Sequence, residues 1–554
     1  MIQRRVAVGA VALAAIVLVF RVGTTFAARF SFPFDLEWME GGMLAHAWRL
    51  QRGLPLYAPP SPDFVPYVYP PGYSAVVAAL GDLFGLDYQV GRGVSIAATL
   101  ASAAAIATLA WRHMRSWLGG LVGAACFLAL FRASGGFYDL VRPDSLGLAL
   151  LAWSIVLAAE RDRGTDVAGG LLLCAAFLVK HNFAAFGLPL VAMIGLHRGV
   201  SSAVRFTLAS AGPALLMTGL LQWRSDGGFL TYLLSVPSSH PMAWNRFWIG
   251  MPGEIGLVLL PSLLGIAAWL LALSWDEPGR RTQALGLGLG AAAICGVIAW
   301  FLPAIRGVPM TWTSLVGAFV AFGAIGGLTL VRFPQGPSWR FVGAVLTGAF
   351  ALLIAGLMRA HHGGFMNVVM PAHWAISAGL GLGIGWAFQS SRAFVPWVAL
   401  AVAGGQLGWL LETVDFEAPR PTPQLVEAGQ TLLDELEEAC PEGPILAPTV
   451  AWAPVRLGRP PSVHLIALWD LDHAGGPYFQ DVVDMMRTAT KAGHWPCAVQ
   501  GNSDSSRIRL PVSGYQIARY YRRAKRFSAR AQRLRPMTGW RVRSRDILEP
   551  RKTP

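Results

Sequence analysis

The chain has 554 residues, of which 54% are hydrophobic and only 14% are charged, and its mean hydropathy is +0.47. These values exclude a soluble globular protein and indicate a polytopic membrane protein. The formal net charge of +14 does not indicate nucleic-acid binding, because most basic residues fall in short loops between apolar runs or near the C-terminus, and no nucleic-acid motif is present.

The N-terminal apolar run resembles a signal peptide only in its first part. Arg4 and Arg5 precede the apolar residues 6–20, but the run continues past Arg21, and no small-residue cleavage site is followed by a polar mature region. We therefore interpret residues 6–28 as a retained first span. Because Lys and Arg favour the cytoplasmic side, the N-terminus is predicted to lie in the cytoplasm and the residues after this span outside.

About 13 spans follow when runs of about 20 apolar residues are counted and basic loops are placed inside, although several runs are shorter. The predicted spans are 6–28, 93–111, 119–131, 145–159, 167–179, 183–196, 206–223, 255–274, 285–302, 311–330, 341–358, 372–388 and 393–411. Residues 74–86 are too few to cross and contain Asp82, so they are predicted to form an interfacial or re-entrant helix. Residues 111–116 are then cytoplasmic and the C-terminus is external.

The composition changes after Glu412, which divides the chain into a transmembrane domain, residues 1–412, and a small extracytoplasmic α/β domain, residues 413–554. Amphipathic patterns predict helices over residues 424–440 and 482–491, and short apolar runs predict strands over 444–450 and 462–468. Residues 519–552 form a basic tail that either binds anionic headgroups or is simply solvated.

Two cysteines, Cys440 and Cys497, lie in the predicted external domain. An oxidising compartment allows such a pair to form a disulfide, so we predict that they are bonded.

An acid-rich stretch, residues 34–42, follows the first span directly. It contains Asp35, Glu37 and Glu40. Acids this close to the end of a span either lie at the water boundary or take part in chemistry. One interpretation is the mouth of an active site; the other is a solvated helix start, since acids favour helix N-termini.

The external loops collect the other polar residues of the transmembrane domain. With the orientation above, one compartment contains Asp35, Glu37, Glu40, Tyr69, Arg142, Asp144, Lys180, His181, Asn182, Arg246, Arg306, Arg359, His361, His362 and Asn367. Such a set suits a substrate that carries phosphate and a reaction that needs a base, because Arg and Lys neutralise phosphate and a carboxylate can remove a proton from a hydroxyl. The structural alternatives are an Arg142–Asp144 pair at a helix start, a Lys180 that reaches the interface, and interfacial histidines.

Three short motifs resemble a known family. Asp35-Leu36-Glu37, then Tyr69-Pro70-Pro71-Gly72, then Arg142-Pro143-Asp144 in the second external loop resemble the C class of integral-membrane glycosyltransferases (GT-C). The nearest likeness is to the branch with protein O-mannosyltransferases and lipid A aminoarabinose transferases, over about residues 1–412. The resemblance implies a cell-envelope enzyme in the inner or plasma membrane. It would move a sugar from a polyprenyl-phosphate donor to a lipid, glycan or protein acceptor on the extracytoplasmic face.

The resemblance also implies catalytic roles. Asp35 matches the acid that activates the acceptor, Glu37 is the second acid of the pair, and Asp144 matches an acid after the third span. A divalent metal could bind at Asp35, Glu37 and a histidine, but no His pair with helical spacing and no Cys pair supports such a site. The metal requirement stays open.

The segment expected to bind the substrate departs from the family pattern. Relatives have His-Pro-Pro or Lys-Pro-Pro where this chain has Tyr69-Pro70-Pro71, so the expected cation is missing. Charge and orientation make Lys180 and Arg359 the replacements that would hold the donor phosphate. The other candidate substrate-binding residues are Tyr69, Arg142, His361, His362 and Asn367.

Two other classes of function compete with a transferase. A flippase or transporter of lipid-linked sugars would carry inverted repeats and charges at the bilayer midplane, but no internal repeat is visible and the ionisable residues lie at span ends. An assembly protein that works through its external domain would leave the acid-rich stretch unexplained. The sequence identifies neither the sugar nor the acceptor.

Overall fold

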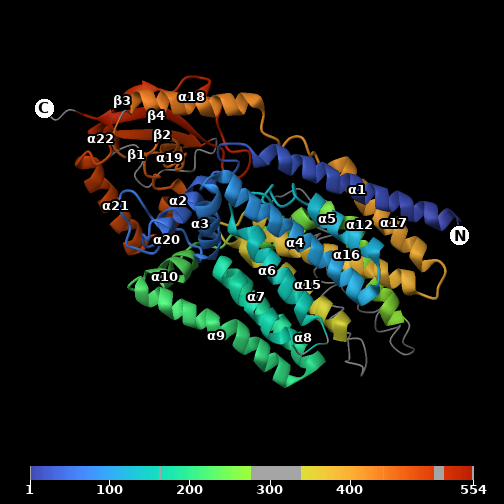
Figure 1. Ribbon diagram of the computed structural model, residues 1–554. Coiled ribbons are helices and arrows are strands. Elements are labelled where there is room, and N and C mark those ends of the chain that lie inside the picture. Colours follow the sequence, from blue (N-terminus) through green and yellow to red (C-terminus); the bar gives the residue numbers. More distant parts are fainter. Residues whose placement is uncertain are drawn as a thin grey trace, which may run out of the picture.

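The computed structural model describes residues 2–160, 162, 164–275, 339–440, 442–503 and 517–551. A bundle of long helices has the N-terminus at one end, and a small α/β unit lies at the other end (Figure 1). The predicted spans 285–302 and 311–330, together with Arg306, lie outside the described residues.

The long helices of the bundle correspond to the predicted spans. They are α1 (Ile2–Phe30), α4 (Tyr88–Met114), α5 (Trp117–Ala129), α6 (Pro143–Ala158), α7 (Thr165–Val179), α8 (Gly187–Arg198), α9 (Val200–Arg224), α12 (Met251–Trp275), α15 (Trp339–Ala360), α16 (Met370–Gln389) and α17 (Val395–Thr413). Shorter helical segments are α2 (Glu40–Gln51), α3 (Gly72–Phe84), η1 (His181–Phe186), α10 (Gly228–Leu230), η2 (Thr231–Ser235), α11 (Val236–Ser238), η3 (Arg246–Gly250) and η4 (Met366–Val369). Among the described residues, 6 helices are long and apolar enough to cross a membrane. The chain is therefore a multi-pass membrane protein, whereas the count of about 13 spans stays a prediction.

The ends of α1, α4 and α17 lie on the sides of the bundle that the charge pattern predicted relative to one another. Arg92, in the second turn of α4, donates hydrogen bonds to the carbonyls of Phe32 and Phe34, just beyond the end of α1. Helix α4 therefore begins where α1 ends, so α3 between them does not cross the bundle, as predicted. Arg29, at the end of α1, donates to the carbonyl of Pro419 at 3.0 Å, which places the chain after α17 at this same end. Which end faces the cytoplasm stays a prediction.

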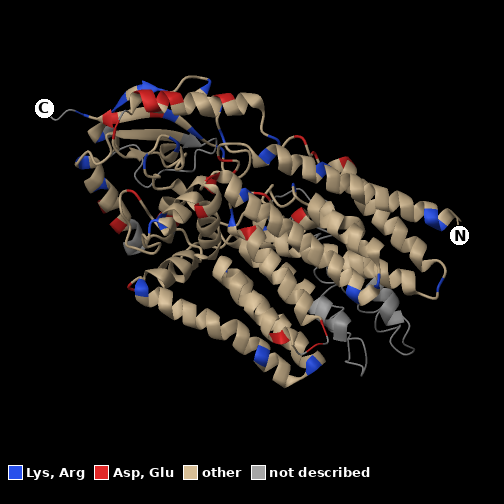
Figure 2. Ribbon diagram, viewed as in Figure 1, with Lys and Arg blue, Asp and Glu red and all other residues tan. Residues whose placement is uncertain are grey.

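Charge is distributed as expected for a bundle in lipid. Figure 2 shows charged residues concentrated in the α/β unit and near helix ends, with long uncharged stretches between them. On the outer face of α9, Leu208, Leu215 and Leu216 are exposed. An apolar face of this kind is stable against hydrocarbon rather than water.

The C-terminal unit is a small mixed sheet with helices. Its helical elements are α18 (Pro423–Ala439), α19 (Ala453–Arg456), α20 (Leu465–Ala474), α21 (Gly476–Lys491), α22 (Ile517–Tyr520) and η5 (Ala531–Arg533). Its strands are β1 (Ile445–Leu446), β2 (Cys497–Ser503), β3 (Tyr521–Arg526) and β4 (Val542–Pro550), in the order β1-β2-β4-β3. Strand β1 is parallel to β2, and the other pairs are antiparallel.

Of the four elements predicted for this unit, the two helices are confirmed, the strand over 444–450 is present as the two-residue β1, and the strand over 462–468 is wrong. Helices α18 and α21 contain the predicted helical segments, but residues 462–468 lead into helix α20 instead of forming a strand. Periodicity cannot separate strand from helix in so short an apolar run. His464 begins α20, because its side chain accepts the Ile466 N–H at 3.0 Å.

The predicted basic tail is not a tail. Residues 521–526 and 542–550 are β3 and β4, and their basic side chains are paired. Arg522 lies 2.6 Å from Glu549, and Lys525 lies 2.5 Å from Glu438 on α18. Partners that are distant in sequence, one on the neighbouring strand β4 and one on helix α18, explain why the basic run is not a simple solvated segment.

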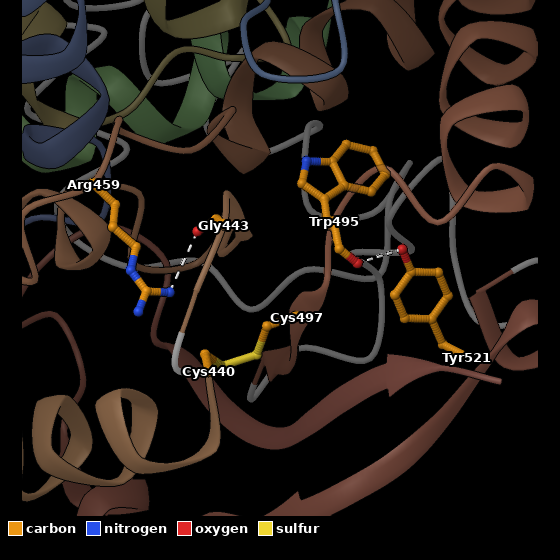
Figure 3. The surroundings of a disulfide bond; sticks show 6 residues. All are labelled: Cys440, Gly443, Arg459, Trp495, Cys497 and Tyr521. Carbon is orange, nitrogen blue, oxygen red and sulfur yellow. Dashed lines mark hydrogen bonds between the residues drawn. A yellow bond between two sulfur atoms is a disulfide. The ribbon is translucent and has the colours of Figure 1, made fainter. Parts of the chain in front are cut away.

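The predicted disulfide between Cys440 and Cys497 is present, with the two Cα atoms 5.6 Å apart (Figure 3). It joins the end of α18 to the start of β2, where β1 also pairs through Ile445 and Cys497. Beside it, the Tyr521 hydroxyl donates to the carbonyl of Trp495 at 2.7 Å. These bonds fix the sheet to the helix that follows the membrane bundle.

Candidate active site

The acid-rich stretch is held by a buried ion pair. Glu40, at the start of α2, accepts from Arg92 through both carboxylate oxygens, at 3.0 and 2.7 Å, and both side chains are 0% exposed. Glu40 also accepts the backbone N–H groups of Leu36 at 2.7 Å and Val141 at 2.9 Å. Its lone pairs are thus occupied by protein donors, which makes Glu40 a structural acid that fixes the loop between α1 and α2.

Asp35, the predicted base, is bonded within this loop. Its Oδ1 accepts the Gly41 N–H at 2.8 Å and the Tyr88 hydroxyl at 3.1 Å. Asp35 and Tyr88 also line a small cavity of about 20 Å³ shared with Leu432 and Arg456 of the C-terminal unit. Burial, reinforced by the charge of Glu40, raises the pKa of Asp35 well above its usual range. Asp35 therefore positions the start of α2 and forms no hydrogen bond with the other predicted site residues among those described.

Glu37 points to a different set of partners. Its Oε2 accepts the Met39 N–H at 3.1 Å and lies 3.4 Å from Nη1 of Arg142. Arg142, which precedes α6, also donates to the Tyr69 hydroxyl at 2.9 Å. Burial raises the pKa of Glu37 to about 7, although the positive charge of Arg142 opposes the rise. A carboxylate with that pKa can accept a proton near neutral pH.

Asp144, Lys180 and Asn367 form a second group of contacts, which lies next to the Glu37–Arg142–Tyr69 group because Arg142 is close to Asp144. Asp144, in the first turn of α6, accepts from Lys180 Nζ at 2.5 Å and from the Asn367 amide at 2.7 Å. Lys180 follows α7, and Asn367 lies on η4. Nε of Arg142 lies 3.8 Å from Oδ2 of Asp144, and within the described part of the chain both of these buried atoms lack a hydrogen-bond partner.

These residues form one cluster, which we name the acid–base cluster. Its members are Glu37, Tyr69, Arg142, Asp144, Lys180 and Asn367. They come from separate loops and helix ends, all at the end of the bundle next to the C-terminal unit. The structure thus brings together six residues that the sequence predicted as site residues from widely separated positions.

Arg359, His361 and His362, which the sequence also predicted as substrate-binding residues, contact other groups. Arg359 forms a bidentate pair with Glu254 of α12, at 2.6 and 2.9 Å, and donates to the Gly364 carbonyl. The His361 ring bonds to the carbonyl of Pro237 at 2.9 Å, and the His362 ring stacks on Trp469 with 5.4 Å between ring centroids. Arg359 therefore holds the α12–α15 junction, and its guanidinium is already occupied where the sequence predicted a phosphate ligand.

Asp35 and Glu37, which the sequence offered as possible metal ligands, contact other groups. Within the part of the chain that the structure describes, no three His, Cys, Asp or Glu side chains are grouped as metal ligands. Asp35 and Glu37 point their carboxylates at different partners, Tyr88 in one case and Arg142 in the other.

Sequence reasoning missed two residues beside the cluster. The Tyr67 hydroxyl is buried without a hydrogen-bond partner in the described residues, and the charges of Arg142 and Glu37 act on it. Asp470 lies on α20 of the C-terminal unit, and the charge of Arg142 acts on its carboxyl group. Tyr67 could have been found in the Tyr- and Pro-rich segment that contains Tyr69, but no sequence pattern indicates that Asp470 approaches the membrane domain.

The cluster has the groups that a phosphate substrate and a proton transfer require. Arg142 has an N–H without a partner among the described residues, and Lys180 uses one of its three ammonium hydrogens on Asp144. Charge-assisted hydrogen bonds from these donors would bind phosphate oxygens strongly. Glu37 supplies a carboxylate next to the same guanidinium group.

No protein-family model matches the sequence, and no curated protein is similar to it at a significant level. Among solved structures, the chain is similar to ArnT from Cupriavidus metallidurans in the apo state, with 16% identity, a TM-score of 0.42, and coverage of 87% of this chain and 92% of that chain. It is also similar to ArnT from the same organism bound to undecaprenyl phosphate, with 15% identity, a TM-score of 0.43, and coverage of 96% and 97%. ArnT is a lipid A aminoarabinose transferase of the GT-C class, the branch that the sequence resembles. At these identities and TM-scores, the similarity assigns no role to any residue of this chain.

Proposed function

We propose that this chain is a membrane glycosyltransferase that moves a sugar from a polyprenyl-phosphate donor to an acceptor. The observation that carries the proposal is the acid–base cluster itself. It combines Glu37, whose pKa is about 7, with a buried arginine and a buried lysine at one end of a membrane bundle. A lipid-linked phosphate would reach this position from the bilayer without leaving it.

The positions of the cluster residues suggest which step of the sugar transfer each of them would assist. Glu37 would remove the proton from the acceptor hydroxyl as its oxygen forms a bond to the anomeric carbon of the sugar. The bond between that carbon and the phosphate oxygen would break, and its electron pair would leave with the polyprenyl phosphate. Arg142 and Lys180 would stabilise the phosphate in both the donor and the product, with Asp144 and Asn367 holding Lys180 in place.

The three motifs support the same assignment from the sequence side. Glu37, Tyr69, Arg142 and Asp144 all belong to the segments that resemble GT-C glycosyltransferases, and they lie in one cluster. We assign the role of base to Glu37 instead of Asp35, keep Lys180 as a phosphate ligand, and assign Arg142 as its partner instead of Arg359. The sugar and the acceptor are left open.

A transfer assay tests the proposal. The purified protein in liposomes would receive undecaprenyl phosphate linked to radiolabelled mannose, glucose, galactose or arabinose, with lipid A, a Ser- and Thr-containing peptide and cell-envelope glycans as acceptors, with and without Mg²⁺. Undecaprenyl phosphate is the lipid bound in one of the ArnT structures. We expect label to leave the lipid and enter an acceptor, with release of free undecaprenyl phosphate.

A matched pair of variants links the activity to the cluster. Arg142→Lys keeps the charge but removes the planar guanidinium that contacts Glu37 and Tyr69, and we expect it to raise the KM for the donor and to lower kcat. Arg522→Lys makes the same change on exposed β3 and should behave as the wild type. Label that crosses the bilayer while still attached to the lipid would contradict the proposal and identify a flippase.

A further inference from the structure

Helix α20 of the C-terminal unit is anchored to loops of the membrane domain, one of which contains Glu37 of the acid–base cluster. The His464 ring, at its start, bonds to the carbonyl of Trp38 at 2.5 Å, one residue after Glu37. Trp469 stacks on His362 with an interplanar angle of 11°. The His240 ring bonds to the backbone carbonyl of Asp470 at 2.7 Å. These contacts join α20 to three separate loops of the membrane domain and fix the start of α20 beside Trp38, the neighbour of Glu37 in the chain.

Among the described residues, Asp470 is a buried acid whose carboxyl group has no protein partner. The residue is 6% exposed, and no described residue donates a hydrogen bond to its carboxyl group or forms an ion pair with it. Burial raises the pKa of Asp470 to about 8, opposed by the charge of Arg142, and the charge of Asp470 in turn acts on Tyr69. Its carboxyl oxygens are not among the fully enclosed polar atoms, so a ligand can reach them, and a largely buried carboxyl group without a protein partner is not explained by support of the fold.

We infer that Asp470 is a substrate-binding residue which the C-terminal domain contributes to the acid–base cluster, and that it binds a hydroxyl group of the donor sugar. The inference rests on the proposed function. The sugar is bonded directly to the phosphate, so a phosphate held by Arg142 places the sugar hydroxyls beside the groups that surround Arg142. The carboxyl group of Asp470 can bind a sugar hydroxyl whether or not it is ionised. The ionised form accepts a hydrogen bond from the hydroxyl, and the protonated form can both donate and accept one.

This role separates Asp470 from the phosphate ligands. Arg142 and Lys180 recognise a group that every polyprenyl phosphate carries, whereas Asp470 recognises a group that only the glycosylated lipid carries. Loss of Asp470 should therefore weaken binding of the glycosylated donor alone. This difference distinguishes a sugar contact from a general structural role.

Binding to two lipids tests the inference. We would measure the affinity of the protein in nanodiscs for undecaprenyl phosphate and for undecaprenyl phosphate linked to mannose, glucose, galactose or arabinose. We expect the wild type to bind at least one glycosylated lipid more tightly than the bare lipid. Asp470→Ala should weaken that binding about tenfold, the size of one hydrogen bond, and leave binding of undecaprenyl phosphate unchanged. Asp470→Asn keeps a hydrogen-bond acceptor, so its affinity for the glycosylated lipid should lie between those of the wild type and of Asp470→Ala.

The matched control is Asp484→Ala, which removes an exposed carboxylate from α21 of the same domain and should change neither affinity.

Two binding results would overturn the inference. One is a wild type that binds every glycosylated lipid no more tightly than the bare lipid, and the other is an Asp470→Ala variant that keeps the wild-type preference for the glycosylated lipid. If transfer occurs and Asp470→Ala keeps the wild-type KM for the donor, the inference fails and the proposed function stands. If no transfer occurs but Asp470→Ala selectively loses the glycosylated lipid, the inference stands and the proposed function fails.

A stability measurement shows that the variant is folded and that the carboxyl group is buried. In the folded chain Asp470 keeps its proton up to about pH 8, whereas in the unfolded chain it loses the proton near pH 4. Its contribution to stability is therefore largest at low pH and falls as the pH rises between these values. Asp470→Asn should have the wild-type Tm near pH 4 and an increasingly higher Tm than the wild type up to pH 8. A constant Tm difference across this range would show that Asp470 is not buried as described and would overturn the inference.

Discussion

Replacing Glu37 by Gln is expected to lower kcat for sugar transfer by about 10²- to 10⁴-fold, the usual loss when a general base is removed. Gln keeps the size of the side chain and a hydrogen-bond acceptor for the Met39 N–H and for Arg142, so donor binding should be retained. Because the pKa of Glu37 is about 7, the wild-type kcat should rise with pH up to about 7 and then level off. The residual activity of Glu37→Gln should show no such rise. Initial rates at saturating donor between pH 5.5 and 8.5 give both results.

Asp35→Asn is the matched control for this change. It removes the negative charge of Asp35, two residues before Glu37, but the new amide oxygen can still accept hydrogen bonds from the Gly41 N–H and the Tyr88 hydroxyl. We expect a smaller loss of kcat than in Glu37→Gln, and no change in the shape of the pH profile. A Glu37→Gln enzyme with wild-type turnover, combined with a large loss in Asp35→Asn, would return the role of base to Asp35, as the sequence alone predicted.

Glu40→Gln is expected to destabilise the folded protein by about 3 to 5 kcal/mol, because it leaves Arg92 as an uncompensated buried charge. The substitution also replaces one of the two carboxylate oxygens with a donor, so one of the N–H groups of Leu36 or Val141 loses its acceptor. We expect low yield and a much lower Tm in detergent, measured by loss of the monodisperse peak after heating.

Glu438→Gln provides the control for this prediction. Glu438 is exposed on α18 and pairs with Lys525, so its loss should change Tm little, since surface ion pairs contribute at most about 1 kcal/mol. A Glu40→Gln protein that is as stable as the wild type but inactive would show that Glu40 belongs to the chemistry and not to the support of the loop.

The arrangement of helices could be predicted because it follows from two simple rules. A membrane span needs a long apolar run, and basic residues favour one side, so the run length and the positions of residues such as Arg112 and Arg115 predicted which helix ends share a side. The short helix α3 was recognised as non-crossing by the same reasoning, and the bonds of Arg92 to Phe32 and Phe34 confirm it.

The roles of individual site residues could not be predicted in the same way. Asp35 and Glu37 are two positions apart, and only the folded loop shows that one carboxylate contacts Tyr88 and the other Arg142. Arg359 looked available for phosphate because its partner, Glu254, is distant in sequence. Asp470 was missed because the run before it was interpreted as a strand, and because no local pattern shows that this domain covers the membrane bundle.

The position of the donor phosphate tests the location of the active site most directly. We expect a cryo-EM structure of the full chain in nanodiscs with undecaprenyl phosphate to place the phosphate within hydrogen-bond distance of Nε of Arg142 and of Lys180 Nζ, at the end of the bundle below α20. A phosphate bound beside Arg359 and Arg246, away from Glu37, would contradict the assignment of the acid–base cluster as the site of sugar transfer.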